Sequence, residues 1–595
     1  MIKRLTILLL LISVTCVINA QDKRERIPAA PVKLTEPVMS SGVITGPGHT
    51  TADANYIAVD TSANAFGGAG SAINPLAYDP SSDVVALVYR GDTTFASGSG
   101  ELWYSISTDR GQTWRRISAV NTSNSQKAAR YPSMTIANPA KGGITETIAL
   151  FSWPELNPAS FGFIGYAAEQ PVGGGAPFAG IDQGPPAYGI SIPCWSSDNS
   201  SWLFWAADNQ TDAGIYLWRT QDLGSIENIK PPQWSDTVFS GVGNLPLGAD
   251  SWNGTQYYAV LGTFSESLAP EPILSGWYPG YSKSTDNGAT WNNFKVADWR
   301  NIPALSKYDR LYDWTKGDDF VSYDGDMRVD KNGFVHLIVS LTAITEDDNN
   351  TGVNAVVDIF ETENGWDGRV VYEGLNDATY GYGPGIAQMG PSPYIAFNQD
   401  RDIMAVQFVN SGPDNNYADI YLSYANLGEA FSAPENLTNS PQIHNTQSHF
   451  APYLAENGDR NFTAFSFYAY QAGATGPQTD STRATALYVA PVNFTVAPTA
   501  VNTGISPINS FELSQNYPNP FNPVTNIKYS VAKNSKVTLK VFDMLGREIV
   551  TLVNTTMDAG VYDVRFDASE LASGLYLYTL NTGDFISSRV MLYLK

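Results

Sequence analysis

The sequence predicts an all-β protein: a large fold of repeated antiparallel sheets, followed by a small β-sandwich. Nearly the same octet occurs twice, as STDRGQTW at 107–114 and as STDNGATW at 284–291. A longer unit, two strands joined by a polar turn, recurs seven times along the chain. The charge balance changes near residue 510. Residues 29–510 hold 22 basic and 48 acidic side chains, whereas the last 85 residues hold eight of each.

Each octet predicts a β-hairpin turn that is held by its own side chains. Asp109 can accept hydrogen bonds from backbone N–H groups, and Gly111 can take a positive φ. Trp114 then begins the return strand with a large ring to bury. The octet opens with Ser107, and its second copy has the same residue types at Ser284, Asp286, Gly288 and Trp291. We therefore interpret the two carboxylates as parts of turns rather than as catalytic groups.

The seven longer units set the architecture. The first strand begins close to a proline in six of the units and close to a glycine in the fifth unit. In chain order these residues are Pro75, Pro132, Pro193, Pro246, Gly325, Pro393 and Pro452. Proline is tolerated on a strand with a free edge, such as the innermost strand of a radial sheet. After most of these hairpins comes a second one, which makes a four-stranded blade. Regular repetition of such units predicts a seven-bladed β-propeller over residues 51–495, with six blades as the alternative.

The octets also carry a family resemblance. Ser-x-Asp-x-Gly-x-Thr-Trp resembles the Asp-box, or BNR repeat, of sialidase-like β-propellers. The resemblance implies that the boxes lie at blade corners, away from the ligand-binding mouth. A sialidase would also need a cluster of three arginines, a tyrosine with a glutamate partner and an aspartate acid. The matching RIP sequence stands at 26–28, outside any blade, so sialidase activity itself is not expected.

The start of the chain predicts export. Residues 1–20 have a basic tip and an apolar run too short to span a membrane, which is typical of a cleaved signal peptide. Residues 21–50 read as an N-terminal extension. Cys194 is then the one remaining cysteine, so no intramolecular disulfide is expected. The acidic body would repel phosphate backbones, which argues against nucleic acid as a partner. We expect a monomer without a transmembrane segment.

The end of the chain predicts a second domain. Residues 496–510 form a polar linker with proline and glycine, and alternation places Val537, Leu539 and Val541 on one face of a strand. Residues 511–595 suggest a small Ig-like sandwich. Their segments NYPNPFNPVTNIKYSV and AGVYDVRFDASELASGLYLYTL resemble the type A sorting domain of the type IX secretion system. The resemblance implies contact with that machinery and passage through the periplasm, then release or attachment at the outer-membrane surface.

Ligands of such propellers bind where the innermost strands begin. The candidate binding residues at these starts are Asn74, Arg130, Tyr131, Asn244, Asp324, Asp326 and His449. They would surround one opening on a rigid frame. Aromatic residues in glycine- and proline-rich stretches, such as Trp153 and Tyr278, could stack on sugars.

Catalytic activity would depend on one pair of carboxylates. Asp324 and Asp326 are weak catalytic candidates, because Asp-x-Asp on a strand puts both carboxylates on one face. Such a pair is more often a solvated turn or a weak calcium site, so a structural calcium stays open and no other cofactor is expected. Four scattered histidines predict no metal site. The sequence thus favours a secreted or surface-displayed propeller that binds a glycan or protein. The alternative is an extracellular glycoside hydrolase.

Overall fold

The protein forms two compact units, which are described separately below. The structure is a computed structural model, and the chain divides into unit 1, Met1–Val496, and unit 2, Ala497–Lys595. The described residues are 56–62, 73–91, 100–121, 129, 131–157, 160–182, 191–195, 202–207, 215–222, 225–229, 245–262, 277–311, 324–343, 353–375, 391–411, 418–438, 446–470, 485–498, 511–513, 515–516, 519–558, 560–583 and 585–595. The expected signal peptide, the N-terminal extension and most of the linker lie outside them.

The described residues of unit 1 form seven antiparallel sheets, numbered here in chain order. Sheet 1 consists of β2 (Leu76–Asp79), β3 (Val84–Arg90), β4 (Leu102–Ser107) and β5 (Arg115–Ala119). Sheet 2 consists of β6 (Ser133–Ala137), β7 (Ile148–Asn157), β8 (Ser160–Glu169) and β9 (Phe178–Asp182). Sheet 3 consists of β10 (Ser191–Trp195), β11 (Trp202–Ala207), β12 (Ile215–Asp222) and β13 (Ser225–Ile229). Sheet 4 consists of β14 (Leu245–Trp252), β15 (Thr255–Gly262), β16 (Tyr278–Ser284) and β17 (Lys295–Val296).

The last three sheets of unit 1 follow the same plan. Sheet 5 consists of β19 (Gly325–Val329), β20 (Val335–Thr342), β21 (Asn354–Thr362) and β22 (Gly365–Glu373), with β18 (Arg310–Leu311) also beside β20. Sheet 6 consists of β23 (Tyr394–Phe397), β24 (Ile403–Ser411), β25 (Ala418–Asn426) and β26 (Glu435–Asn436). Sheet 7 consists of β27 (Thr446–Phe450), β29 (Asn461–Tyr470), β30 (Thr485–Thr495) and β1 (Ile57–Ser62), with β28 (Ala455–Glu456) beside β29. Sheets of four antiparallel strands in sequence order fit the blades of a propeller.

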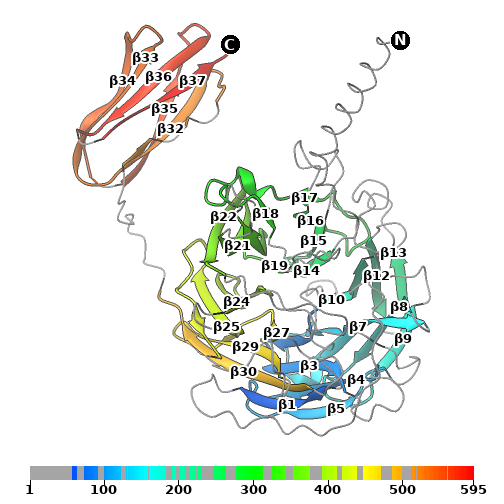
Figure 1. Ribbon diagram of the computed structural model, residues 1–595. Helices are drawn as coiled ribbons and strands as arrows, with labels where there is room; N and C mark the ends of the chain where they lie inside the picture. The colour runs from blue at the N-terminus through cyan, green and yellow to red at the C-terminus, as the bar shows by residue number, and fades with distance from the viewer. Residues whose placement is uncertain are drawn as a thin grey trace, which may run out of the picture. The chain divides into compact units, whose positions relative to one another are not determined.

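The sheets stand side by side around a common centre, as Figure 1 shows. The first strand of each sheet contacts the first strand of the next, from β2 and β6 through to β23 and β27. The earliest strand of the chain, β1, pairs with the last strand of unit 1, β30. Sheet 7 is therefore completed by the beginning of the chain.

Apolar side chains between neighbouring sheets form the core. On β3 the side chains alternate: Val84, Ala86 and Val88 pack towards sheet 2, whereas Val85 and Leu87 pack towards sheet 7. A strand buried on both faces reads as a continuous apolar run, which explains why these segments lack an alternating pattern. Equivalent clusters join sheet 4 to sheet 5, sheet 5 to sheet 6 and sheet 6 to sheet 7.

Three features of unit 1 differ from the expectations. Sheet 7 was expected to begin near Pro452, but β27 ends at Phe450, because Pro452 instead offers its carbonyl to the N–H of Phe397 in sheet 6. Trp153 lies within β7 with no exposed surface, because its indole N–H donates to Glu155. Tyr278 is buried in β16 against Trp299. Neither ring is placed to stack on a sugar.

The two octets fold into the same hydrogen-bonded turn. Thr113 donates to Asp109 from its backbone N–H at 2.9 Å and from its hydroxyl at 2.6 Å. The hydroxyl of Ser107 accepts from the N–H of Gly111 at 2.7 Å, and Gly111 has a φ of +82°. The indole N–H of Trp114 donates to the Gly111 carbonyl at 3.1 Å. The second copy repeats this pattern around Ser284, Asp286, Gly288, Thr290 and Trp291.

We expect Asp109→Ala and Asp286→Ala each to lower the free energy of unfolding by about 1–2 kcal/mol, because each removes hydrogen bonds to a charged acceptor. Chemical denaturation of the full chain measures the effect. Gln112→Ala, at an exposed neighbour in the first turn, serves as the control and should change little. A loss of ligand binding at unchanged stability would make the octets functional sites instead of turns.

The described residues of unit 2 form two sheets that pack face to face. One has the order β31 (Glu512–Leu513), β32 (Val524–Val531) and β35 (Gly560–Asp567). The other has the order β34 (Glu548–Met557), β33 (Ser535–Asp543), β36 (Gly574–Asn581) and β37 (Ile586–Tyr593). Val537, Leu539 and Val541 are fully buried in one shared core, as the alternation predicts.

Candidate functional site

Neighbouring first strands begin at the same end of unit 1, which we call the strand-start end. The Asn74 carbonyl, before β2, accepts from the N–H of Met134 in β6 at 2.7 Å. Asp324, before β19, accepts from the N–H of Ser392, just before β23, at 3.0 Å. The starts of sheets 1 and 2, and of sheets 5 and 6, are therefore in direct contact.

Two residues at this end hold strained backbone. Tyr131 has a φ of +42° and Ser392 a φ of +38°, and each stands immediately before the proline that leads into β6 or β23. Residues before proline are already restricted, and a positive φ is unfavourable for a bulky side chain such as tyrosine. Strain of this kind costs free energy and clusters at binding sites. This strained backbone occurs at equivalent positions, at the starts of sheets 2 and 6.

Asp324 and Asp326 both reach towards sheet 6. One carboxylate oxygen of Asp326 accepts from the N–H of Ile395 at 3.1 Å, and the other accepts from Met327 at 2.8 Å. Arg328 lies 3.4 Å from the same carboxylate. Ile395 is in the first strand of its sheet, which pairs with β24 alone among the described strands, so Asp326 supplies an acceptor that a strand would otherwise supply. Burial raises the pKa of Asp326 above its ordinary value, although Arg328 and the two N–H groups act in the opposite direction.

Next to this pair, sheets 6 and 7 bring together buried polar groups without partners. The hydroxyl of Tyr394, the amide oxygen of Gln407 and the hydroxyl of Ser448 are buried and have no hydrogen-bond partner among the residues that the structure describes. Tyr394 lies opposite Gln407 in the β23–β24 pair. The amide N–H of Gln407 donates to the His449 carbonyl at 3.2 Å, and Ser448 precedes His449 in β27.

The tyrosine at the centre of this group stays protonated. Burial raises the pKa of Tyr394 well above its ordinary value, and the negative charges of Asp324 and Asp326 raise it further. Its hydroxyl can therefore donate a hydrogen bond over the whole physiological range. The imidazole of His449, also buried, lies with its ring centre 5.1 Å from that of Tyr394.

The structure thus brings part of the expected set together. Asp324, Asp326 and His449 gather around Tyr394, while Asn74 and Tyr131 lie at the starts of sheets 1 and 2. Arg130 and Asn244 lie outside the described residues. Sequence reasoning missed Tyr394, Gln407 and Ser448. The Ser-Pro-Tyr start of the sixth unit could have pointed to Tyr394, but finding Gln407 requires the strand register.

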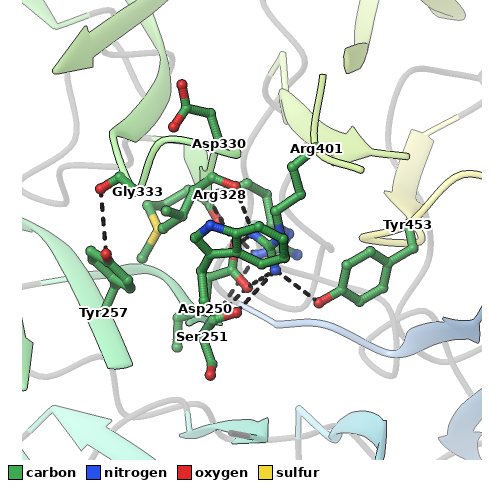
Figure 2. Close-up of polar contacts among 12 residues, drawn as sticks. Asp250, Ser251, Tyr257, Arg328, Asp330, Gly333, Arg401 and Tyr453 are labelled. Atoms are coloured by element: carbon green, nitrogen blue, oxygen red, sulfur yellow. Dashed lines mark hydrogen bonds and ion pairs between the residues drawn. The ribbon is translucent and has the colours of Figure 1, made fainter. Parts of the chain in front are cut away.

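At the opposite end, a buried ion pair links four sheets (Figure 2). The guanidinium of Arg401, from the turn after β23, holds both oxygens of Asp250 in β14, at 2.6 and 3.0 Å. It also donates to the carbonyls of Val329 and Ser251 and to the Tyr453 hydroxyl. Its side chain and that of Asp250 are only 3% and 5% exposed, so this end presents no free charge at the pair.

The guanidinium of Arg401 favours the charged form of Asp250. Burial alone would raise its pKa, but the attraction and the hydrogen bonds of Arg401 outweigh burial and lower the pKa below its ordinary value. The Arg401 guanidinium also lies 4.7 Å from the centre of the Trp252 ring. These side chains lie at the end where the first strands of sheets 4 and 5 finish.

No described helix is long and apolar enough to cross a membrane. Among the described residues, no three His, Cys, Asp or Glu side chains are grouped as a metal ion would need.

Comparison with known proteins identifies one domain. Residues 515–592 match the family described as "Secretion system C-terminal sorting domain". The chain therefore carries a type IX sorting domain, and the protein is secreted or attached at the outer-membrane surface. Comparison with curated proteins gives no match.

Several solved structures are distantly similar to the chain. An alpha-L-arabinanase from Penicillium chrysogenum is 12% identical, with 62% of this chain and 96% of that chain covered and a TM-score of 0.35. An alpha-L-arabinofuranosidase of Fusarium graminearum is 13% identical, with 63% and 99% covered and a TM-score of 0.32. A lectin from Burkholderia pseudomallei is 10% identical, with 71% and 99% covered and a TM-score of 0.38. Similarity at this level leaves the ligand of the present chain open.

Proposed function

We propose that the protein is an exported seven-bladed β-propeller that binds a neutral glycan at its strand-start end. In this proposal residues 1–20 are the signal peptide, 21–50 an extension, 51–495 the propeller with Asp-boxes at two corners, 496–510 a linker and 511–595 an Ig-like sorting domain. The seven described sheets of four or five strands and the closure of sheet 7 by β1 support the propeller.

The observation that carries the proposal is the group of unpaired polar atoms on Tyr394, Gln407 and Ser448. A buried donor or acceptor without a partner costs about 1–3 kcal/mol, so three on neighbouring strands require an explanation. A ligand that brings its own hydroxyl groups, directly or through an ordered water, would satisfy them. Hydroxyls and amides are the groups that recognise sugars, and the strained backbone at Tyr131 and Ser392 supports a binding role for this end.

The charges at this end favour a neutral ligand. Asp324 and Asp326 stand beside Tyr394, and residues 29–510 carry 48 acidic against 22 basic side chains. An acidic glycan would be repelled by this field, whereas a neutral one would not. Binding is favoured over hydrolysis because Asp324 and Asp326 already accept backbone N–H groups.

A glycoside hydrolase is the second candidate, and one observation favours it. Burial raises the pKa of Asp326, as a general acid requires, and a second carboxylate stands two residues away. Turnover of a panel of fluorogenic glycosides by the full chain, abolished by Asp326→Asn, would establish this candidate in place of binding alone.

We expect Tyr394→Phe to weaken glycan binding by roughly tenfold without lowering stability. The loss of one hydrogen bond to the ligand accounts for that factor, and the hydroxyl has no protein partner to lose. Glycan arrays identify the ligand, and calorimetry with the full chain measures its dissociation constant.

The matched control is Tyr281→Phe, in the third strand of sheet 4. Its hydroxyl donates to Glu361 at 2.6 Å, so this variant should lose about 1 kcal/mol of stability and bind the ligand normally. If Tyr394→Phe instead loses stability and keeps full affinity, the hydroxyl serves a structural water and the proposed site is wrong.

A further inference from the structure

The two edges of the four-stranded sheet in unit 2 differ. Along β37, the backbone of Phe521 exchanges hydrogen bonds with Leu592 and Leu594, at 3.0 and 3.1 Å. The side chain of Gln515 donates to the Val590 carbonyl at 2.7 Å. At the other edge, β34 pairs with β33 on one side and is the last strand of the sheet. Among the described residues of unit 2, one edge is therefore covered and the other is open.

The open strand carries only part of the usual protection. Edge strands are commonly guarded by lysine, proline or bulges, because their unpaired N–H and C=O groups invite another strand. The sequence of β34, EIVTLVNTTM, contains neither lysine nor proline. Register shifts leave Ile549 and Leu552 without an opposite residue in β33, whereas residues 553–557 pair regularly. Ile549 is 38% exposed. The unguarded part of the edge is therefore 553–557.

The turn that leads into β34 presents apolar side chains on a fixed frame. Met544 is 61% exposed and Leu545 is 81% exposed. The carboxylate of Asp543 accepts from the N–H groups of Leu545 and Arg547 at 3.0 and 2.9 Å, and the Gly546 N–H donates to the Asp543 carbonyl at 3.0 Å. A turn held in this way keeps the two apolar side chains in solvent instead of letting them fold back.

We propose that the β33–β34 hairpin is the surface by which the secretion machinery holds the chain. An extended segment of a machinery protein adds as a strand to the open edge of β34, and Leu545 and Met544 enter an apolar pocket beside it. Strand addition supplies affinity through main-chain hydrogen bonds, and flanking side-chain pockets supply selectivity.

Charge and family membership identify the occupant as a machinery protein. The last 85 residues carry eight basic and eight acidic side chains, so long-range attraction cannot bring unit 2 to a partner. Recognition must come from apolar contact and backbone pairing, and the hairpin offers both together. It also lies inside residues 515–592, the segment that matches the sorting-domain family.

The test measures export of the full chain in cells that secrete it, as the ratio of protein outside the cell to protein retained in the periplasm. We expect the Met544→Ser, Leu545→Ser pair to lower that ratio by roughly tenfold, because two exposed apolar anchors are lost. Asn554→Lys with Thr555→Lys, which places charge on the open edge, should have a similar effect.

Matched controls lie elsewhere on the same sheet. Leu575→Ser and Ile586→Ser replace residues that are 47% and 66% exposed on β36 and β37, and Ser588→Lys adds charge beside the covered edge. These variants should be exported as the parent is, and thermal unfolding should show all variants folded.

Normal export of both hairpin variants would overturn the proposal. Retention of the control variants in the periplasm to the same extent as the hairpin variants would also overturn it. Flotation of the full chain with lipid vesicles tests whether the occupant is a membrane instead. If Met544→Ser with Leu545→Ser reduces flotation, and Asn554→Lys with Thr555→Lys leaves export unchanged, the hairpin binds a membrane and the proposal is wrong.

Discussion

Arg401→Met is expected to lower the free energy of unfolding of unit 1 by about 3–5 kcal/mol, the usual cost of removing one partner from a buried ion pair. The loss is large because Asp250 stays charged and is 5% exposed. Arg401 also joins the carbonyls of Ser251 and Val329, so sheets 4, 5 and 6 lose a shared donor. Denaturant unfolding of the full chain, followed by tryptophan fluorescence, measures the shift of the midpoint.

Two control variants separate the effect of burying the ion pair from the effect of removing one charge. Arg110→Met breaks the pair with Asp83, whose side chains are 36% and 40% exposed, and should cost less than about 1 kcal/mol. Asp250→Leu combined with Arg401→Met removes both charges and should recover part of the loss. Equal effects of Arg401→Met and Arg110→Met would show that the buried pair contributes no more than a surface pair.

Acidification should distinguish the parent from Arg401→Met. The pKa of Asp250 in the folded parent lies below its value in the unfolded chain, about 3.9. Its stabilising contribution is therefore fully present above about pH 4 and is lost as the pH falls through the lowered pKa. In the variant, Asp250 keeps the N–H groups of Ser251 and Val329 but loses its ion-pair partner, so burial raises its pKa relative to the parent and protonation on acidification relieves the cost. The stability gap between parent and variant should thus narrow as the pH falls.

Local features of the fold were predictable from the sequence. The strand starts after Pro75, Pro132 and Pro393 match β2, β6 and β23, because proline and a following apolar run act within a few residues. The octet turns were predictable for the same reason: every hydrogen bond that holds them joins residues at most four positions apart.

Contacts between sheets were not predictable in this way. Arg401 and Asp250 are 151 positions apart, and neither is unusual in its local sequence. Trp153 looked like a loop residue because proline follows it, yet a partner two residues along, Glu155, allows its indole to be buried. Whether the Tyr394 hydroxyl finds a hydrogen-bond partner depends on the side chains that sheet 7 places beside it. Those neighbours are determined only when the sheets assemble.

Deletion of residues 511–595 is expected to abolish export and leave unit 1 folded. Five apolar clusters lie wholly within the described residues of unit 1, and a sixth lies wholly within those of unit 2. Removing unit 2 therefore opens none of the clusters of unit 1, and the unfolding midpoint of the remaining chain should match that of unit 1 in the parent.

The location of the truncated chain should change completely, because residues 515–592 carry the sorting domain. Immunoblots of the medium, the cell surface and the periplasm should find it in the periplasm alone, with a glycan affinity equal to that of the full chain. Residues 497–595 joined to an unrelated periplasmic reporter should carry the reporter outside, which separates loss of a signal from loss of folding. Truncated protein in the medium at the parental level would mean that unit 1 contains an export signal of its own. In that case, the open edge of β34 would have to serve another partner.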